Sequence, residues 1–166
     1  MTTTLILGGA RSGKTTYALR AAEMTGRGPV MIATGEALDV EMEDRIARHR
    51  AERGPAWRTL EAPLDLAAAV NQIGPGETAV IDCLTLWVSN LMFAERDIDE
   101  EAALLTAALQ GREVILVSNE VGLGIVPDNA LARSFRDAAG RLNQQMAAAA
   151  DKVVFIAAGL PLVLKG

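Results

Sequence analysis

Apolar runs alternate with amphipathic stretches along the whole chain. Short, continuously apolar runs favour strands buried on both faces, and longer stretches with helical spacing favour amphipathic helices. The predicted strands are Thr3–Leu7, Pro29–Thr34, Thr78–Ile81, Glu113–Val117 and Lys152–Ala157, with a short extended piece at Trp57–Leu60 and a short tail at Leu162–Leu164. The predicted helices are Thr15–Met24, Asp39–Arg53, Leu64–Ile73, Leu84–Ala94, Asp99–Leu109 and Asp128–Ala150. Strands separated by helices predict an α/β fold with a mainly parallel sheet and helices on both of its faces.

Length and composition indicate one globular domain spanning residues 1–166. The chain has 166 residues, shows no internal repeat or low-complexity linker, and is 50% hydrophobic but only 4% aromatic. A chain of this length can bury a sizeable core. We therefore expect a core of aliphatic side chains between closely packed helices.

The net charge limits the kinds of binding partner to be expected, and the cysteine content indicates the cellular compartment. The formal net charge of −5 argues against a nucleic-acid binder, which needs a basic face, and does not exclude a small anionic ligand. Cys83 is the only cysteine, so no intrachain disulfide can form, as suits a reducing compartment. No apolar run approaches the roughly 20 residues of a transmembrane segment, and Leu5–Leu7 is too short for a signal-peptide core. We expect a cytoplasmic protein.

The first predicted strand runs into a phosphate-binding loop. Residues 8–15 fit the pattern G-x-x-x-x-G-K-[ST], and they read Gly8, Gly9, Ala10, Arg11, Ser12, Gly13, Lys14 and Thr15. Glycines let the backbone curl so that its N–H groups point at phosphate oxygens, and the helix N-terminus adds partial positive charge there. Lys14 is expected to reach the β- and γ-phosphates, and Thr15 to bind Mg²⁺. The position between a strand and a helix favours this P-loop over a glycine-rich turn without a ligand.

Two acids follow other predicted strands. Asp82 ends the strand Thr78–Ile81, where a P-loop enzyme needs a second residue for Mg²⁺. Its alternative role is the N-cap of the helix that begins at Leu84. Glu120 follows the strand Glu113–Val117 and could position a nucleophile, accept its proton or cap a loop. No Asn-Lys-x-Asp run is present to read guanine, so these motifs indicate a phosphotransferase acting on a small molecule.

His49 is the only histidine, and it lies on a highly charged predicted helix with Arg45 and Arg53 one turn away on either side. Neighbouring cations lower the pKa of an imidazole and favour its neutral, nucleophilic form. A neutral imidazole can attack an α-phosphorus and hold the nucleotide as a phosphoramidate. The spacing alone equally allows an ordinary solvated histidine.

Further motifs accompany the P-loop, and two of their segments, EVGLGIVP at 120–127 and FRDAAGRLNQ at 135–144, are far more specific than the P-loop itself. The motifs are MIATG at 31–35, DVEMEDRIARHRAERG at 39–54, WRTLE at 57–61, DCLTLWVSN at 82–90, VSNEVGLGIVP at 117–127 and RSFRDAAGRLNQQMAAAAD at 133–151. Together with the P-loop they resemble the bifunctional adenosylcobinamide kinase / adenosylcobinamide-phosphate guanylyltransferase family of cobalamin biosynthesis. The resemblance runs from Leu5 to about Lys165 in the family's order and spacing.

This resemblance implies two reactions. The enzyme would phosphorylate adenosylcobinamide with a nucleoside triphosphate, ATP or GTP. It would then transfer GMP from GTP to adenosylcobinamide phosphate, giving adenosylcobinamide-GDP and pyrophosphate. The family passes GMP through a histidine in an R-I-x-x-H context, which here is His49, so His49 and Lys14 are the catalytic candidates.

The resemblance also assigns binding positions and an assembly. The nucleotide contacts are Ala33, Thr34, Gly35, Arg50, Ala51, Glu52, Arg53, Glu61 and Asp82, with Thr15 and Asp82 at the metal. The segment Val121–Pro127 would form part of the corrinoid cleft. The arginines Arg133, Arg136 and Arg141 could neutralise phosphate or simply lie on the surface. The family fold is RecA-like and its members tend to form trimers, so Trp87, Leu91, Met92 and Phe93 could be interface, although core is the simpler expectation.

One P-loop would have to serve attack at the γ-phosphorus and at the α-phosphorus. This requires the helix carrying His49, flanked by Gly35 and Gly54, to move, or the nucleotide to bind in two ways. Two rival hypotheses stay open. A monofunctional kinase would leave His49 inert, and a nucleotide sensor would show no corrinoid-dependent turnover.

Overall fold

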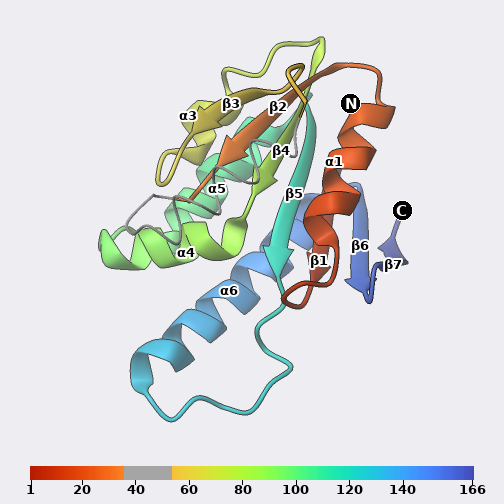
Figure 1. The fold of residues 1–166 in the computed structure, drawn as a ribbon. Coiled ribbons are helices and arrows are strands. Elements are labelled where there is room, and N and C mark those ends of the chain that lie inside the picture. Colours follow the sequence, from red (N-terminus) through yellow and green to blue (C-terminus); the bar gives the residue numbers. More distant parts are fainter. Residues whose placement is uncertain (36–53) are drawn as a thin grey trace.

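The computed structural model describes residues 1–35 and 54–166, and its strands form one sheet in the order β3-β2-β4-β5-β1-β6-β7 (Figure 1). The strands are β1 (Thr3–Gly8), β2 (Gly28–Ala33), β3 (Arg58–Glu61), β4 (Glu77–Asp82), β5 (Glu113–Asn119), β6 (Lys152–Ala157) and β7 (Leu160–Lys165). All neighbouring pairs are parallel except β6 and β7. The predicted α/β fold with a mainly parallel sheet is confirmed.

Helices cover both faces of this sheet. In the described ranges they are α1 (Lys14–Met24), α3 (Leu66–Val70), α4 (Leu84–Phe93), α5 (Ile98–Leu109) and α6 (Ala130–Ala149). Helix α1 lies on one face, and α3, α4, α5 and α6 lie on the other (Figure 1). The predicted helix Asp39–Arg53 lies entirely outside the described residues. None of the helices in the described ranges is long and apolar enough to span a bilayer.

The core explains why the strands read as continuous apolar runs. Leu5 and Ile6 are adjacent in β1 and both fully buried, Leu5 toward the helices of the larger face and Ile6 toward α1. Successive side chains of a strand point to opposite faces, so a sheet covered twice needs apolar residues at every position. Trp87 and Leu91 are fully buried in the core, whereas Phe93 is 77% exposed. Of the possible interface side chains in α4, Phe93 is thus the most exposed, and Met92 is partly buried.

The C-terminal end differs from the sequence expectation. The predicted short tail is a complete strand, β7, which pairs antiparallel with β6 through the two-residue turn Ala158–Gly159. Both turn residues have positive φ, 51° and 79°, the geometry that matches the twist of a tight hairpin. All six residues of β7 are exposed, and therefore the burial pattern that identified the other strands is missing from it.

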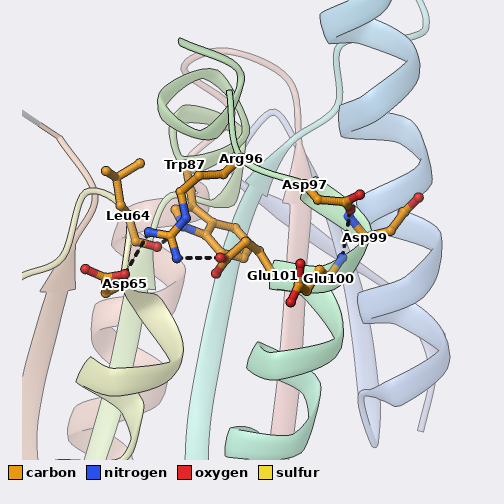
Figure 2. A network of polar contacts seen from close by, with 8 residues as sticks. All are labelled: Leu64, Asp65, Trp87, Arg96, Asp97, Asp99, Glu100 and Glu101. Atoms are coloured by element: carbon orange, nitrogen blue, oxygen red, sulfur yellow. Dashed lines mark hydrogen bonds and ion pairs between the residues drawn. The ribbon is translucent and has the colours of Figure 1, made fainter. Parts of the chain in front are cut away.

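A polar network fastens α3, α4 and α5 together (Figure 2). The Trp87 indole N–H donates to the Leu64 carbonyl at 2.7 Å. Arg96, after α4, pairs with Asp65 before α3 at 2.7 Å and with the buried carboxylate of Glu101 in α5. Hydrogen bonds to these two carboxylates raise the pKa of Arg96 above its ordinary value. The network holds α4, which begins just beyond Asp82, at the carboxyl edge of the sheet.

Candidate active site

The P-loop joins β1 to α1, and its glycines are required by close contacts. A Cβ on Gly8 would lie 2.5 Å from the Ile156 carbonyl oxygen and 2.6 Å from Ser12 Oγ. Gly13 has a φ of 96°, and a Cβ there would lie 3.3 Å from Gly159 Cα. The loop therefore follows a path that side chains at these two positions would block.

The loop is already curled around its own lysine. Lys14 Nζ donates to the Gly9 carbonyl at 2.7 Å, and the Ser12 N–H donates to the same carbonyl at 3.3 Å. The Gly159 N–H donates to the Ser12 carbonyl at 2.8 Å, which ties the β6–β7 turn to the P-loop. Ser12 Oγ is buried and has no hydrogen-bond partner among the described residues. A glycine cradle with a lysine at the start of a helix has the chemistry of a phosphate site.

Thr15 and Asp82, the two residues predicted to hold a metal ion, meet in the structure. Thr15 Oγ1 donates to Asp82 Oδ2 at 2.9 Å. Helix α4 has Cys83 at its N-cap position, without a side-chain cap, so the alternative of Asp82 as the cap is wrong. In the described ranges, no three Asp, Glu, His or Cys side chains are arranged so that they could hold a metal ion by themselves. A hydroxyl and one carboxylate fit Mg²⁺, which usually keeps several waters and takes further oxygens from substrate phosphates.

Thr34 lies at the same edge but has a structural role. It is fully buried, and its hydroxyl both donates to the Cys83 carbonyl and accepts from the Cys83 N–H, each at 2.8 Å. Asn90 Nδ2 donates to the Thr34 carbonyl at 2.8 Å. Ala33 and Gly35, on either side of Thr34, are only half-buried. In this predicted nucleotide-binding segment they are the positions that remain accessible to a ligand.

The remaining predicted residues lie apart from the P-loop or outside the described ranges. Glu61 is exposed at the end of β3, in register with Ala33. His49 and the predicted contacts Arg50, Ala51, Glu52 and Arg53 lie outside the described residues. The arginines of α6 have ordinary structural surroundings: Arg133 donates to the Pro127 and Asp128 carbonyls, Arg136 pairs with Asp137, and Arg141 is exposed.

Glu120 is close to the P-loop through its backbone. Its N–H donates to the Gly8 carbonyl at 3.0 Å, and its carboxylate accepts a short hydrogen bond from the Gly122 N–H. The carboxylate therefore caps the loop that follows β5, and the backbone of Glu120 contacts the P-loop.

Sequence reasoning missed a polar cluster at the end of β5. Ser118 Oγ donates to Asn143 Oδ1 at 2.6 Å and lies 3.3 Å from Thr85 Oγ1. The Asn119 N–H donates to Thr85 Oγ1 at 2.6 Å. The available signal was the change from apolar to polar residues in the last two positions of EVILVSN.

Comparisons with known proteins agree with this geometry. Residues 4–164 match the family described as cobinamide kinase / cobinamide phosphate guanyltransferase. The bifunctional adenosylcobalamin biosynthesis protein CobP of Pseudomonas aeruginosa is 49% identical over 168 residues, covering 98% of this chain and 96% of the relative. The bifunctional adenosylcobalamin biosynthesis protein CobU of Salmonella typhimurium is 41% identical over 181 residues, covering 97% of this chain and 98% of the relative.

Solved structures support the fold. The flagellar accessory protein FlaH of Methanocaldococcus jannaschii has a TM-score of 0.56 at 12% identity, over 99% of this chain and 78% of that one. The RadB recombinase has a TM-score of 0.56 at 15% identity, over 93% and 73%. The architecture is therefore RecA-like, as the resemblance implied.

Proposed function

The chain belongs to the cobinamide kinase / cobinamide phosphate guanyltransferase family, and on this premise we propose how its residues divide the two reactions. The enzyme is a bifunctional kinase and guanylyltransferase of cobalamin biosynthesis. The observation that carries the proposal is the pairing of a complete P-loop with Asp82, since Thr15 and Asp82 are in hydrogen-bond contact. The substrates we propose are adenosylcobinamide and its phosphate, with ATP or GTP for the kinase step and GTP for the transfer.

In the kinase reaction, the aminopropanol hydroxyl oxygen of adenosylcobinamide attacks the γ-phosphorus. The bond from that phosphorus to the β,γ-bridging oxygen breaks, and the nucleoside diphosphate leaves with the electron pair. Lys14 stabilises the phosphate charge once a nucleotide replaces its contact with the Gly9 carbonyl. Glu120 accepts the hydroxyl proton after releasing the Gly122 N–H.

The guanylyl transfer runs through His49. Its imidazole nitrogen attacks the α-phosphorus of GTP, and pyrophosphate leaves. A phosphate oxygen of adenosylcobinamide phosphate then attacks the same phosphorus, the P–N bond breaks, and the imidazole returns to its neutral form. Arg50, Ala51, Glu52, Arg53 and Glu61 join Ala33 and Gly35 as contacts to the bound nucleotide. This assignment rests on the family motif R-I-x-x-H, because His49 lies outside the described residues.

Thr15 and Asp82 would hold a Mg²⁺ ion together with water and phosphate oxygens. When bound, the ion neutralises charge on the phosphates. The 2.9 Å contact between Thr15 Oγ1 and Asp82 Oδ2 supports this choice, because it brings the two proposed ligand oxygens next to each other.

The segment Val121–Pro127 is the proposed corrinoid contact. It follows Glu120 directly and exposes Leu123, Ile125 and Val126 by 83%, 97% and 60%. Large apolar side chains are rarely exposed together without a partner, and a methyl-rich corrin ring offers a matching apolar surface. Arg133 steadies the end of this segment through the Pro127 and Asp128 carbonyls.

A trimeric assembly and a cytoplasmic location complete the proposal. Edge strand β7 exposes Leu160, Leu162, Val163 and Leu164, while its one charged residue, Lys165, donates to carbonyls at the end of α6. Burial against another copy would remove this surface from water. The single cysteine suits a reducing compartment.

The decisive experiment uses GTP labelled at the α-phosphate. The protein is incubated with Mg²⁺ and labelled GTP, denatured, and examined for label on the chain. We expect label that survives alkali, is released by acid, moves to adenosylcobinamide phosphate and is absent from His49→Ala. GTP labelled at the γ-phosphate is the matched control and should leave the chain unlabelled. Unlabelled protein that still binds GTP would remove His49 from the mechanism.

A further inference from the structure

Asn119 ends the strand that lies between the P-loop strand, β1, and the strand that ends in Asp82, β4. It is the last residue of β5, which pairs with β1 on one side and β4 on the other, and it is in register with Gly8. Val117, two positions earlier, packs in the core cluster under α1, so Asn119 points to the same face. Val80 belongs to that cluster too, and by the same alternation Asp82 faces α1, as its contact with Thr15 requires. Asn119 and Asp82 thus share the face on which the P-loop lies.

Hydrogen bonds hold the backbone of Asn119, whereas its side-chain amide makes only a weak contact. Its N–H donates to Thr85 Oγ1 at 2.6 Å, and its carbonyl accepts from Asn143 Nδ2 at 3.4 Å. Within the described part of the chain, the side-chain amide has one hydrogen-bond partner, the thiol of Cys83, at 3.8 Å from Nδ2 to Sγ. Sulfur is a weak acceptor, whereas an amide nitrogen carries two good donors. A donor on a firmly held backbone, in register with the first P-loop residue, is therefore available to a stronger acceptor.

We propose that the Asn119 side-chain amide donates a hydrogen bond to the terminal phosphate of a triphosphate held by the P-loop. The P-loop backbone would hold the inner phosphates and Lys14 would reach the β- and γ-phosphates, so the terminal phosphate would lie toward the ends of β4 and β5. A neutral amide there adds a donor without competing with Mg²⁺ at Asp82. The enzyme would thereby distinguish a nucleoside triphosphate from a diphosphate. This assignment rests on the proposed kinase and transferase function of the same site.

Calorimetric binding of two nucleotides tests the assignment. In the presence of Mg²⁺, we expect Asn119→Ala to bind the α,β-methylene analogue of GTP, which cannot guanylylate His49, roughly tenfold more weakly, the typical effect of losing a hydrogen bond to a charged group. Binding of GDP should not change, because GDP lacks the terminal phosphate. Asn119→Asp has the same size and places a negative charge at this point, so it should weaken the analogue further while GDP binding falls much less.

A matched control distinguishes a direct contact between Asn119 and the phosphate from a structural role of Asn119 in holding the loop. Cys83→Ala removes the thiol that the amide now contacts, and it should preserve the wild-type preference for the analogue. Equal losses for both nucleotides in Asn119→Ala would assign Asn119 to holding the loop and overturn the proposal, as would unchanged binding of the analogue. If Asn119→Ala does not fold, the comparison of the two nucleotides is made on Asn119→Asp. Failure of His49 labelling would contradict the transferase mechanism and leave this nucleotide preference intact, so the two failures are distinguishable.

Discussion

Thr15 Oγ1 and Asp82 Oδ2 lie 2.9 Å apart although 67 positions separate them in the chain. Thr15 is fixed by the first turn of α1, and Asp82 by the last position of β4, two strands away from β1 in the sheet order β4-β5-β1. The contact forms across that intervening strand because both side chains project onto the α1 face. The two side chains that we propose to hold Mg²⁺ thus meet on one face of the sheet.

Asp82→Asn should therefore damage metal use more than folding. An amide keeps the size and can still bond Thr15, but it removes the negative charge, and we expect the Mg²⁺ concentration for half-maximal kinase activity to rise about 10–100-fold. A Mg²⁺ titration of nucleotide-dependent phosphorylation measures this. Asp137→Asn on the exposed side of α6 is the control and should leave the titration unchanged. A variant with lower thermal stability and wild-type Mg²⁺ dependence would contradict the metal role.

Gly8→Ala should abolish nucleotide binding. The added Cβ would meet the Ile156 carbonyl at 2.5 Å, and a backbone atom cannot move aside as a flexible side chain could. Gly140→Ala is the matched control, because α6 contains Gly140 with open space around its Cβ position, and alanine favours a helix by about 0.5–1 kcal/mol. Fluorescent-nucleotide titration and thermal melting of both variants test the contrast. Tight binding by Gly8→Ala would show that the P-loop can take another path.

The two tryptophans should respond differently to phenylalanine. Trp87→Phe removes the donor to the Leu64 carbonyl and leaves unfilled volume in the core, so we expect a loss of roughly 1–3 kcal/mol in the free energy of unfolding. Trp57 donates to Glu23 at 3.3 Å in an exposed contact, so Trp57→Phe should cost well under about 1 kcal/mol. Urea unfolding of both variants makes the comparison. Similar losses would mean that the network of Figure 2 does not brace α4.

Stability should decline in alkali because of Cys83. Burial, and then the negative charge of Asp82, raise the pKa of this thiol above its ordinary value. The folded state therefore keeps the proton that the unfolded state loses above about pH 8.5, and the contribution of Cys83 is full below that pH. It falls by up to about 1.4 kcal/mol per pH unit until the folded thiol itself ionises. Urea unfolding between pH 7 and 10 should show a shallower decline for Cys83→Ala, and parallel curves would contradict this.

The sequence by itself determined the features whose signals are local. A strand covered on both faces is apolar at each position, so β1, β2, β4, β5 and β6 could be found within a residue or two of their ends. The P-loop is a contiguous motif whose chemistry depends on residues 8–15 alone, so its position could be predicted directly. The family motifs likewise predicted the activity that the family match confirms, whereas the role of His49 stays a prediction.

Other features were decided by the tertiary structure, since each depends on partners distant in the chain. Strand β7 is exposed at every position, and only its pairing with β6 reveals it. The family resemblance assigned Thr34 to a nucleotide contact, yet the fold brings the Cys83 backbone against its hydroxyl. Asn119 was overlooked because its significance comes from strand order, which places it between the P-loop strand and the Asp82 strand. Local sequence specifies a helix or strand and its pattern of apolar and polar positions. The packing of the whole sheet decides which side chains come into contact.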